Sequence, residues 1–402
     1  MATRVCSYSK INLGLAIGPV RADGFHSLAT LYQTLALHDL VTVEARSASQ
    51  NRAPVNPISQ RRDMGHPGSC ECRITLTTNH PQVPADASNT AWKMVERALA
   101  RMNVAAEVDI HIEKNLPVQG GLGAGSANAA AALIGLEREL GVALPEAERL
   151  EIAAEVGSDV PLFLLGGAVM GTGRGEIVSA MSDLPATPCV IAVPEMRVST
   201  PKAFRDWDAL CETKAATTVD PTSQDRDAHP NEQARRGPRD VGHPGLTSPV
   251  QPGRLEELSR VYASVLGVSP AAEQTHGPSG IVRGSDESDT QNGLAENTLL
   301  ALVRTGIEND FESVVFPQYP FLREIKRLLT GTPAGVSSGT TEDWSGNALV
   351  AALSVSGSAL FGLYRTEADA RTAQQRVQAT GCKAILTETL PRQEYWRRMF
   401  AE

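Results

Sequence analysis

An excess of positive charge, long apolar runs and abundant cysteine are all missing from this sequence, and each absence excludes a class of protein. The 402 residues include 37 Lys and Arg against 46 Asp and Glu, a formal net charge of −9. A basic surface able to neutralise many phosphates is therefore not expected, which argues against nucleic-acid binding. No stretch approaches the ~18 consecutive apolar residues that indicate a membrane-spanning helix, so we expect no membrane partner.

Six cysteines are too few for a disulfide-stabilised scaffold of this length. The first residues lack the continuous apolar segment and small-residue cleavage site of a signal peptide, so we expect a cytoplasmic protein with reduced thiols. Cys70 and Cys72, with His66 and His80 nearby, form a poor zinc set because Cys-x-Cys spacing suits a tetrahedral ion badly and no second cysteine pair follows. We therefore predict no metal site within the protein itself.

At about 150 residues per domain, the length favours two or three domains, and 42% hydrophobic residues supply a core. Residues 46–72, 212–294 and 331–347 contain few core-forming side chains and are predicted to be low-order insertions. Apolar spacing elsewhere predicts regular elements. Strands are expected at 5–18, 31–44, 73–78, 108–112, 160–170, 189–193, 349–364 and 383–387, and helices at 89–103, 126–140, 145–156, 255–266, 296–308, 320–329 and 367–379.

The clearest motif is a glycine-rich loop between a predicted strand and a predicted helix. Glycine lets the backbone approach a ligand closely, and the helix that follows directs unpaired N–H groups at the loop, which suits a polyphosphate. Ser126 adds a hydroxyl suited to a phosphate or its Mg²⁺. A tight turn without a ligand is the alternative, but so many glycines would weaken a purely structural turn. The loop reads Pro117, Val118, Gln119, Gly120, Gly121, Leu122, Gly123, Ala124, Gly125, Ser126 and Ala127.

This loop has neither the Gly-Lys-Ser/Thr of a Walker A motif nor the spacing of a dinucleotide fingerprint. With its Ala-rich helix it resembles the phosphate loop of the GHMP small-molecule kinases. Other stretches resemble, in the expected order, the GHMP kinases that act on 4-diphosphocytidyl-2-C-methyl-D-erythritol. These stretches are Ser9–Leu13, Arg21–His26, Gly157–Pro161, Thr200–Phe204, Asn309–Glu312 and Ser354–Phe361.

The resemblance covers about residues 1–45, 73–207 and 295–365. It implies an α+β fold of two domains around a cleft. Residues 1–195 would form an S5-like α/β domain that carries the phosphate loop and the insertion at 46–72. Residues 196–402 would form a ferredoxin-like domain that carries the other two insertions.

Lys10 and Asp159 suit phosphoryl transfer to an alcohol on physical grounds as well. That reaction needs a group that accepts or orients the hydroxyl proton and a positive charge near the developing oxyanion. Asp159, at the mouth of a predicted buried strand, suits the first role. Lys10, within an apolar strand, suits the second if the two side chains are paired. A structural salt bridge is the alternative, and the resemblance favours a catalytic pair.

The resemblance also implies a substrate pocket. Phe25 would stack on a cytosine base, His26 would read its polar edge, and Phe204 would supply a second aromatic ring. Asn12 matches a position near the acceptor hydroxyl, and Thr200 belongs to a matching substrate segment. Considered without the resemblance, Phe25 is typical of a core side chain and His26 of a surface one.

Four positions complete the comparison with the GHMP kinases. Asn89 and Lys114 match positions that flank the adenine site, although Lys114 alone is typical of an ordinary exposed lysine. Ala127 stands where a second serine is common, which removes a hydroxyl but no backbone donor. Val355 stands where glycine is usual, so the backbone is expected to approach the substrate less closely there.

The resemblance implies an enzyme that uses ATP and Mg²⁺ to phosphorylate the 2-hydroxyl of 4-diphosphocytidyl-2-C-methyl-D-erythritol, a step of non-mevalonate isoprenoid biosynthesis. We expect a monomer or homodimer. A kinase for mevalonate, homoserine or a sugar is one alternative, and it would have no use for a cytosine pocket. A catalytically silent nucleotide-binding protein is another, and it would bind ATP without turnover.

Overall fold

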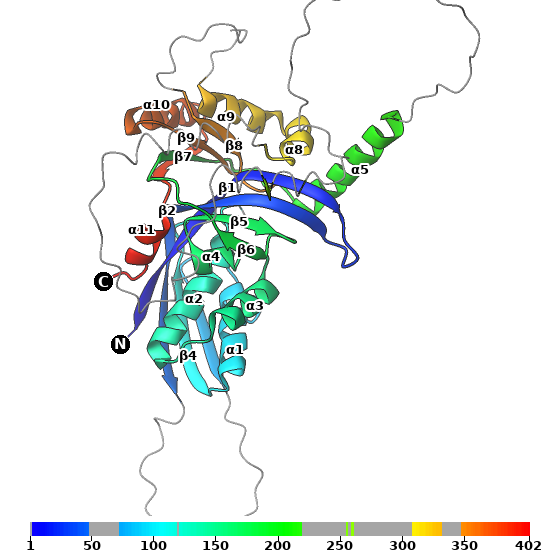
Figure 1. The fold of residues 1–402 in the computed structure, drawn as a ribbon. Coiled ribbons are helices and arrows are strands. Elements are labelled where there is room, and N and C mark those ends of the chain that lie inside the picture. The colour runs from blue at the N-terminus through cyan, green and yellow to red at the C-terminus, as the bar shows by residue number, and fades with distance from the viewer. Residues whose placement is uncertain are drawn as a thin grey trace, which may run out of the picture.

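Figure 1 shows the computed structural model, which describes residues 2–47, 72–118, 120–218, 255, 259–260, 308–331 and 347–402. These residues form two sheets with packed helices, so the predicted α+β class is confirmed. Gln119 and most of the three predicted insertions lie outside the described residues. So do most of the helix predicted at 255–266 and all but the last residue of the helix predicted at 296–308. No helix in the described ranges is long and apolar enough to cross a membrane.

A six-stranded sheet is built around the long hairpin of β1 and β2. Because β2 is so long, it pairs with β1 on one side and with two strands on the other, β5 near its start and β4 near its end. The β3 strand lies parallel to β4, and β6 lies antiparallel to β5. The strands are β1 (Thr3–Val20), β2 (His26–Ser47), β3 (Arg73–Thr78), β4 (Ala106–Glu113), β5 (Ala168–Thr172) and β6 (Ile177–Ala180).

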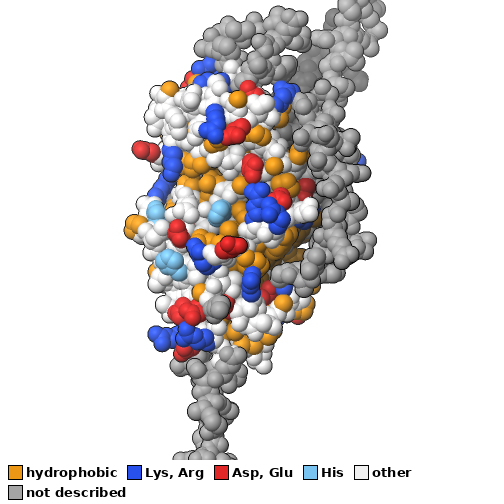
Figure 2. Space-filling model, turned by 90° about the vertical axis from the view of Figure 1, so that its left-hand side faces the viewer, with side chains coloured by type: hydrophobic (Ala, Val, Ile, Leu, Met, Phe, Trp, Pro, Cys, Tyr) orange, Lys and Arg blue, Asp and Glu red, His pale blue; other side chains and the backbone are white. Residues whose placement is uncertain are grey.

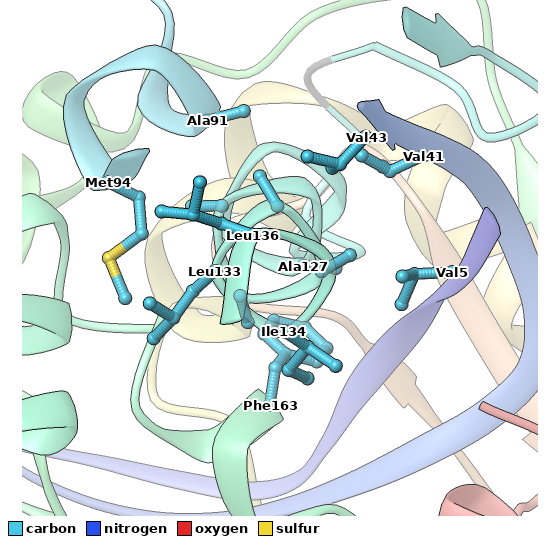
Figure 3. Packing of buried hydrophobic residues seen from close by; sticks show 14 of the residues in the cluster. Val5, Val41, Val43, Ala91, Met94, Ala127, Leu133, Ile134, Leu136 and Phe163 are labelled. Atoms are coloured by element: carbon cyan, nitrogen blue, oxygen red, sulfur yellow. The ribbon is translucent and has the colours of Figure 1, made fainter. Parts of the chain in front are cut away.

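The helix after the glycine loop packs against β1 and β2 and lies at the centre of this half of the core (Figure 3). Its small side chains allow this close approach, since a Cβ at Gly135 would lie 2.7 Å from Val43 Cγ2. Met94 of the first helix and Phe163 of the fourth also pack in this core. The helices are α1 (Thr90–Met102), α2 (Ala124–Leu140), α3 (Glu146–Val156) and α4 (Leu162–Leu165).

The second sheet has the antiparallel order β10-β7-β9-β8, and α9 and α10 pack against it. This is the strand order of a ferredoxin-like unit, as predicted. The β7 strand precedes residue 195, so the change of sheet comes earlier in the chain than the predicted domain boundary. The elements are β7 (Pro188–Val193), α5 (Thr200–Thr218), α8 (Glu312–Gln318), α9 (Pro320–Thr330), β8 (Val350–Leu353), β9 (Leu360–Leu363), α10 (Glu367–Gln378), β10 (Lys383–Glu388) and α11 (Arg392–Arg397).

Two predictions of local structure are wrong. The strand predicted at 160–170 divides into the short helix α4 and strand β5, because Pro161 opens a helical turn and Gly166, at φ +70°, ends it. An apolar run of this length does not distinguish a buried strand from a buried helix. The α5 helix continues to Thr218, past residue 212 where the low-order insertion was predicted to begin.

A shared apolar cluster joins the two sheets. Ile11 and Leu13 of β1 meet Ile191 of β7 and Phe361 of β9 in this cluster, and all four side chains are buried. Leu122 of the glycine loop belongs to the same cluster. The loop is therefore anchored at the junction of the two sheets. On the outer face shown in Figure 2, basic and acidic side chains are interspersed rather than gathered by sign.

Arg392 at the start of α11 fastens the C-terminal segment to the first sheet. Its guanidinium donates hydrogen bonds to the carbonyl oxygens of Ala168 (2.6 Å), Gly166 (3.1 Å) and Met181 (3.2 Å). The carboxylate of Asp183 lies 3.7 Å away and accepts a hydrogen bond from the Arg392 backbone N–H. Since Arg392 is 8% exposed, these contacts replace most of its hydration.

We expect the substitution Arg392→Met to lower the free energy of unfolding by about 3–5 kcal/mol, because it leaves three carbonyls and a carboxylate without their cation. Urea denaturation followed by circular dichroism measures this loss. The matched control is Arg371→Met on α10, whose guanidinium is paired with Glu367 at the surface and should matter little. Equal unfolding midpoints for the two variants would contradict the anchoring role of Arg392.

Candidate active site

A buried ion pair joins the two residues predicted to act in catalysis. Lys10 lies in β1 with its side chain fully buried, and its Nζ is 3.2 Å from Oδ2 of Asp159. Asp159 follows α3 and is 29% exposed, so its carboxylate lies between the buried ammonium and solvent. Burial lowers the pKa of Lys10 from its ordinary value, and the neighbouring carboxylate offsets part of that effect. The sequence-based pairing of the two residues is therefore matched by their geometry.

Three further side chains orient this pair. Asn12 Oδ1 accepts a hydrogen bond from Lys10 Nζ at 2.7 Å, and Asn12 Nδ2 donates to Thr30 Oγ1 at 2.7 Å. Tyr32 donates its hydroxyl to Asp159 Oδ1 at 3.0 Å. Burial and the nearby Asp159 raise the pKa of Tyr32, which keeps it a neutral donor. Sequence analysis missed Thr30 and Tyr32, although their alternate spacing on β2 places them on one face.

The glycine loop meets this pair directly. The Lys10 backbone N–H donates to the carbonyl of Leu122 at 3.0 Å, which fixes the loop against β1. Gly121 and Gly123 have φ of +78° and +71°, in the region that favours glycine. A Cβ at Gly123 would lie 2.9 Å from Phe163 Cζ and 3.0 Å from Lys10 Cγ. A Cβ at Gly121 would collide with the carbonyl of Ser354 in the turn between β8 and β9.

The N-terminus of α2 supplies the chemistry that suits a phosphate. Gly123 caps this helix, and among the described residues no side chain accepts a hydrogen bond from the N–H groups of its first turn. Thr90 Oγ1 donates to the carbonyl of Gly125 at 2.7 Å and holds the loop against α1. Ser126 lies in the first turn. These residues fit a polyphosphate such as that of ATP, because the dipole and the free N–H groups favour an anion.

Of three residues predicted to line the substrate pocket, His26 and Phe204 stack on each other, whereas Phe25 contacts an arginine. The exposure of Phe25 and His26 reverses the interpretation made without the resemblance. His26 is 9% exposed and stacks on Phe204, with ring centroids 4.6 Å apart and planes at 15°. His26 Nε2 lies 2.7 Å from Oδ1 of Asp208, a partner that sequence analysis missed. Phe25 is 53% exposed, and the guanidinium of Arg174 lies over its ring. The interpretation of Phe25 as a core residue and of His26 as a surface residue is therefore wrong.

The turn between β8 and β9 also borders the site, opposite the glycine loop residue Gly121. Thr200 at the start of α5 lies 2.7 Å, Oγ1 to Oγ, from Ser356. Val355 has φ +54°, in the left-handed region that is rare for a β-branched residue and that favours glycine. Asn309 Nδ2 donates to the carbonyls of Leu353 and Val355, at 2.8 and 2.7 Å, and holds the turn in place.

The two residues predicted to flank adenine have structural partners. Asn89 caps α1, since its Oδ1 accepts from the backbone N–H of Ala91 at 2.9 Å. The Lys114 side chain is 3% exposed and its Nζ lies 2.5 Å from Oδ2 of buried Asp39. Asp39 Oδ1 also accepts from the backbone N–H of Leu116 at 2.7 Å, just before the glycine loop. Lys114 is therefore not the exposed lysine that its sequence context suggests.

We expect Gly123→Ala to lower ATP affinity by about tenfold or more, because the methyl group would displace Phe163 or Lys10 where the loop must meet phosphate. The matched control is Gly141→Ala at the C-terminus of α2. Gly141 also has positive φ, +66°, but a Cβ there meets no described atom within 4 Å.

Both variants carry the strain of a side chain at positive φ, about 1–2 kcal/mol. Calorimetric titration with ATP separates the two effects, because only the first variant should lose affinity. Unchanged ATP affinity in Gly123→Ala would show that the loop is only a turn.

Comparisons with known proteins agree with this geometry. The family model for the GHMP kinases N terminal domain matches residues 89–167, which include the glycine loop and Asp159. A 4-diphosphocytidyl-2-C-methyl-D-erythritol kinase from Corynebacterium glutamicum (strain R) is 38% identical over 207 residues, 51% of this chain and 61% of that protein. A relative of the same name from Pseudarthrobacter chlorophenolicus is 32% identical over 305 residues, 73% of this chain and 88% of that protein.

Two solved structures are similar in fold. A 4-(cytidine 5'-diphospho)-2C-methyl-D-erythritol kinase aligns with a TM-score of 0.55 at 22% identity, covering 96% of this chain and 98% of that one. A homoserine kinase from Cytophaga hutchinsonii aligns with a TM-score of 0.57 at 16% identity, covering 97% and 95%. The match to the Corynebacterium protein spans less than two thirds of its length, whereas the match to the Pseudarthrobacter protein spans most of it. On that longer match, the chain belongs to the 4-diphosphocytidyl-2-C-methyl-D-erythritol kinase family of the GHMP kinases.

Proposed function

We propose that this protein transfers the γ-phosphoryl group of ATP to the 2-hydroxyl of 4-diphosphocytidyl-2-C-methyl-D-erythritol, in isoprenoid biosynthesis by the non-mevalonate pathway. One observation carries the proposal. The backbone N–H of Lys10 donates a hydrogen bond to the carbonyl of Leu122 in the glycine loop, while its side chain forms an ion pair with Asp159. A group able to take a hydroxyl proton therefore lies directly beside a loop suited to phosphates.

Asp159 accepts the proton of the 2-hydroxyl. The oxygen of that hydroxyl forms a bond to the γ-phosphorus of ATP while the bond between the γ-phosphorus and the leaving oxygen of ADP breaks. Lys10 places positive charge beside the reacting oxygen, where it offsets the negative charge that develops during transfer. Asn12 holds the Lys10 ammonium at 2.7 Å and lies near the acceptor hydroxyl. The first-turn N–H groups of α2 bind the phosphates.

Mg²⁺ accompanies ATP in this proposal. Among the described residues no group of three or more His, Cys, Asp or Glu side chains is arranged to hold a metal ion. Magnesium bound to a nucleotide commonly takes its ligands from phosphate and water with one or two protein groups. Ser126 in the first turn of α2 is suited to supply one of these.

His26, Phe204 and Phe25 form the cytosine site in this proposal, and Thr200 lies beside it. Rings that stack and polar groups that meet the base edge are the two means by which a pocket selects one base. We further propose a cytoplasmic enzyme, monomeric or homodimeric, with neither nucleic acid nor membrane as a partner. The net charge of −9 supports the absence of nucleic acid.

A coupled assay of ADP release tests the reaction directly. The cytidine substrate, mevalonate and homoserine are compared at equal concentration with the same enzyme and Mg·ATP. We expect turnover with the cytidine substrate alone, because the other two alcohols have no base for the ring pocket. Turnover with homoserine or mevalonate instead would assign the chain to another GHMP activity, and ATP binding without any turnover would favour a silent nucleotide-binding protein.

Asp159→Asn should reduce kcat by about 10²–10⁴-fold, because it removes the charge that draws the hydroxyl proton. Lys10→Met should cause a comparable fall. Since both residues serve one transition state, the double variant should be much less impaired than the product of the two losses. Arg327→Met, which breaks the exposed pair with Glu324 on α9, is the control. Near-normal kcat in either single variant would exclude a catalytic role for that residue.

A further inference from the structure

The turn between β5 and β6 carries an arginine that the mechanism has not used. Arg174 lies in this glycine-rich turn, and its Cζ is 4.9 Å from the centroid of the Phe25 ring. The side chain is 29% exposed, so its cation faces both the ring and solvent. Arg174 therefore borders the residue to which we assign one face of the cytosine site.

The same turn also borders the catalytic pair. The Leu28 backbone N–H donates to the carbonyl of Gly173 at 2.7 Å, which fixes the turn against β2. A Cβ at Gly175 would lie 2.5 Å from the hydroxyl oxygen of Tyr32, the group that donates to Asp159. The side chain of Arg174 thus lies next to Phe25 of the proposed base site, and the next residue in the chain, Gly175, lies next to Tyr32 of the proposed catalytic site.

The guanidinium retains donors for an anion. Its Nε lies 3.4 Å from Oε1 of Glu176, and Glu176 Oε2 accepts from the Arg174 backbone N–H at 2.5 Å. The Glu176 carboxylate therefore contacts the backbone of the turn and the Nε atom of the guanidinium. Among the described residues no hydrogen bond uses the terminal guanidinium nitrogens of Arg174. The two terminal nitrogens carry four N–H groups, and their planar arrangement matches the oxygens of a phosphate.

We propose that Arg174 binds the diphosphate of the substrate. This inference rests on the proposed function: in the cytidine substrate a diphosphate links the nucleoside to the polyol, so it must lie between the base and the reacting hydroxyl. Arg174 is placed between the residues assigned to those two ends. It is therefore a binding residue that distinguishes a nucleoside diphosphate from a nucleoside.

The test measures binding of cytidine, CMP and CDP to the full chain by calorimetry. A saturating β,γ-imido analogue of ATP occupies the glycine loop, so that CDP reports on the substrate site alone. Wild-type protein should bind CDP more tightly than cytidine. Arg174→Ala should weaken CDP binding by about 10- to 100-fold and leave cytidine binding nearly unchanged, as expected for the loss of charge-assisted hydrogen bonds. Arg174→Lys should recover part of the CDP affinity.

The matched control is Arg138→Ala, which removes a guanidinium 3.9 Å from the ring of Phe400, on the side of the fold where β1 meets the C-terminal segment. It should leave all three affinities unchanged. Equal CDP affinity in Arg174→Ala and wild type would overturn the proposal, as would an equal loss of cytidine and CDP affinity. If wild-type protein bound neither cytidine nor CDP, the cytidine-kinase function itself would fail, which is a different result from a failure confined to the Arg174 variants.

Discussion

The buried ammonium of Lys10 is the constraint on which the rest of the site depends. A charge without solvent is tolerated only when it is paired and hydrogen-bonded, and here Asp159 and Asn12 supply those contacts. Asp159 must therefore be held at one place at the end of α3, and Tyr32 holds it there. The Lys10 backbone in turn fixes the glycine loop through Leu122. Packing of the core therefore also brings Lys10, Asp159 and the glycine loop together.

Local sequence was a good guide wherever one face of an element is buried. The alternation of residues 73–78 and the stripe of residues 89–103 predicted β3 and α1 closely, because period 2 and period 3.6 are direct consequences of strand and helix geometry. The apolar run at 160–170 was misread because burial on all sides removes that periodicity. The α11 helix was missed because it is short and is stabilised by Arg392 contacts with distant carbonyls.

In the site, too, local features could be predicted from the sequence and contacts between distant segments could not. The glycine loop could be recognised locally, whereas the 3.2 Å pairing of Lys10 with Asp159 depends on how two distant segments pack. The surroundings of His26 and Lys114 could not be predicted either, since Asp208 and Asp39, which pair with them, are remote in sequence. Arg174 did have a signal, an arginine between glycines next to an acidic residue, but its meaning depends on the ring that it covers.

The stacking of His26 on Phe204, together with the guanidinium over Phe25, has a consequence for recognition. Both aromatic faces proposed for the base are already in contact with the protein's own side chains. A base that stacks on these same faces would exchange one set of ring contacts for another, and the affinity gained from stacking would reflect the difference between them. A base that merely stacks gains little from such an exchange. A ligand that also forms hydrogen bonds with the displaced imidazole and guanidinium would therefore be favoured over one that only stacks.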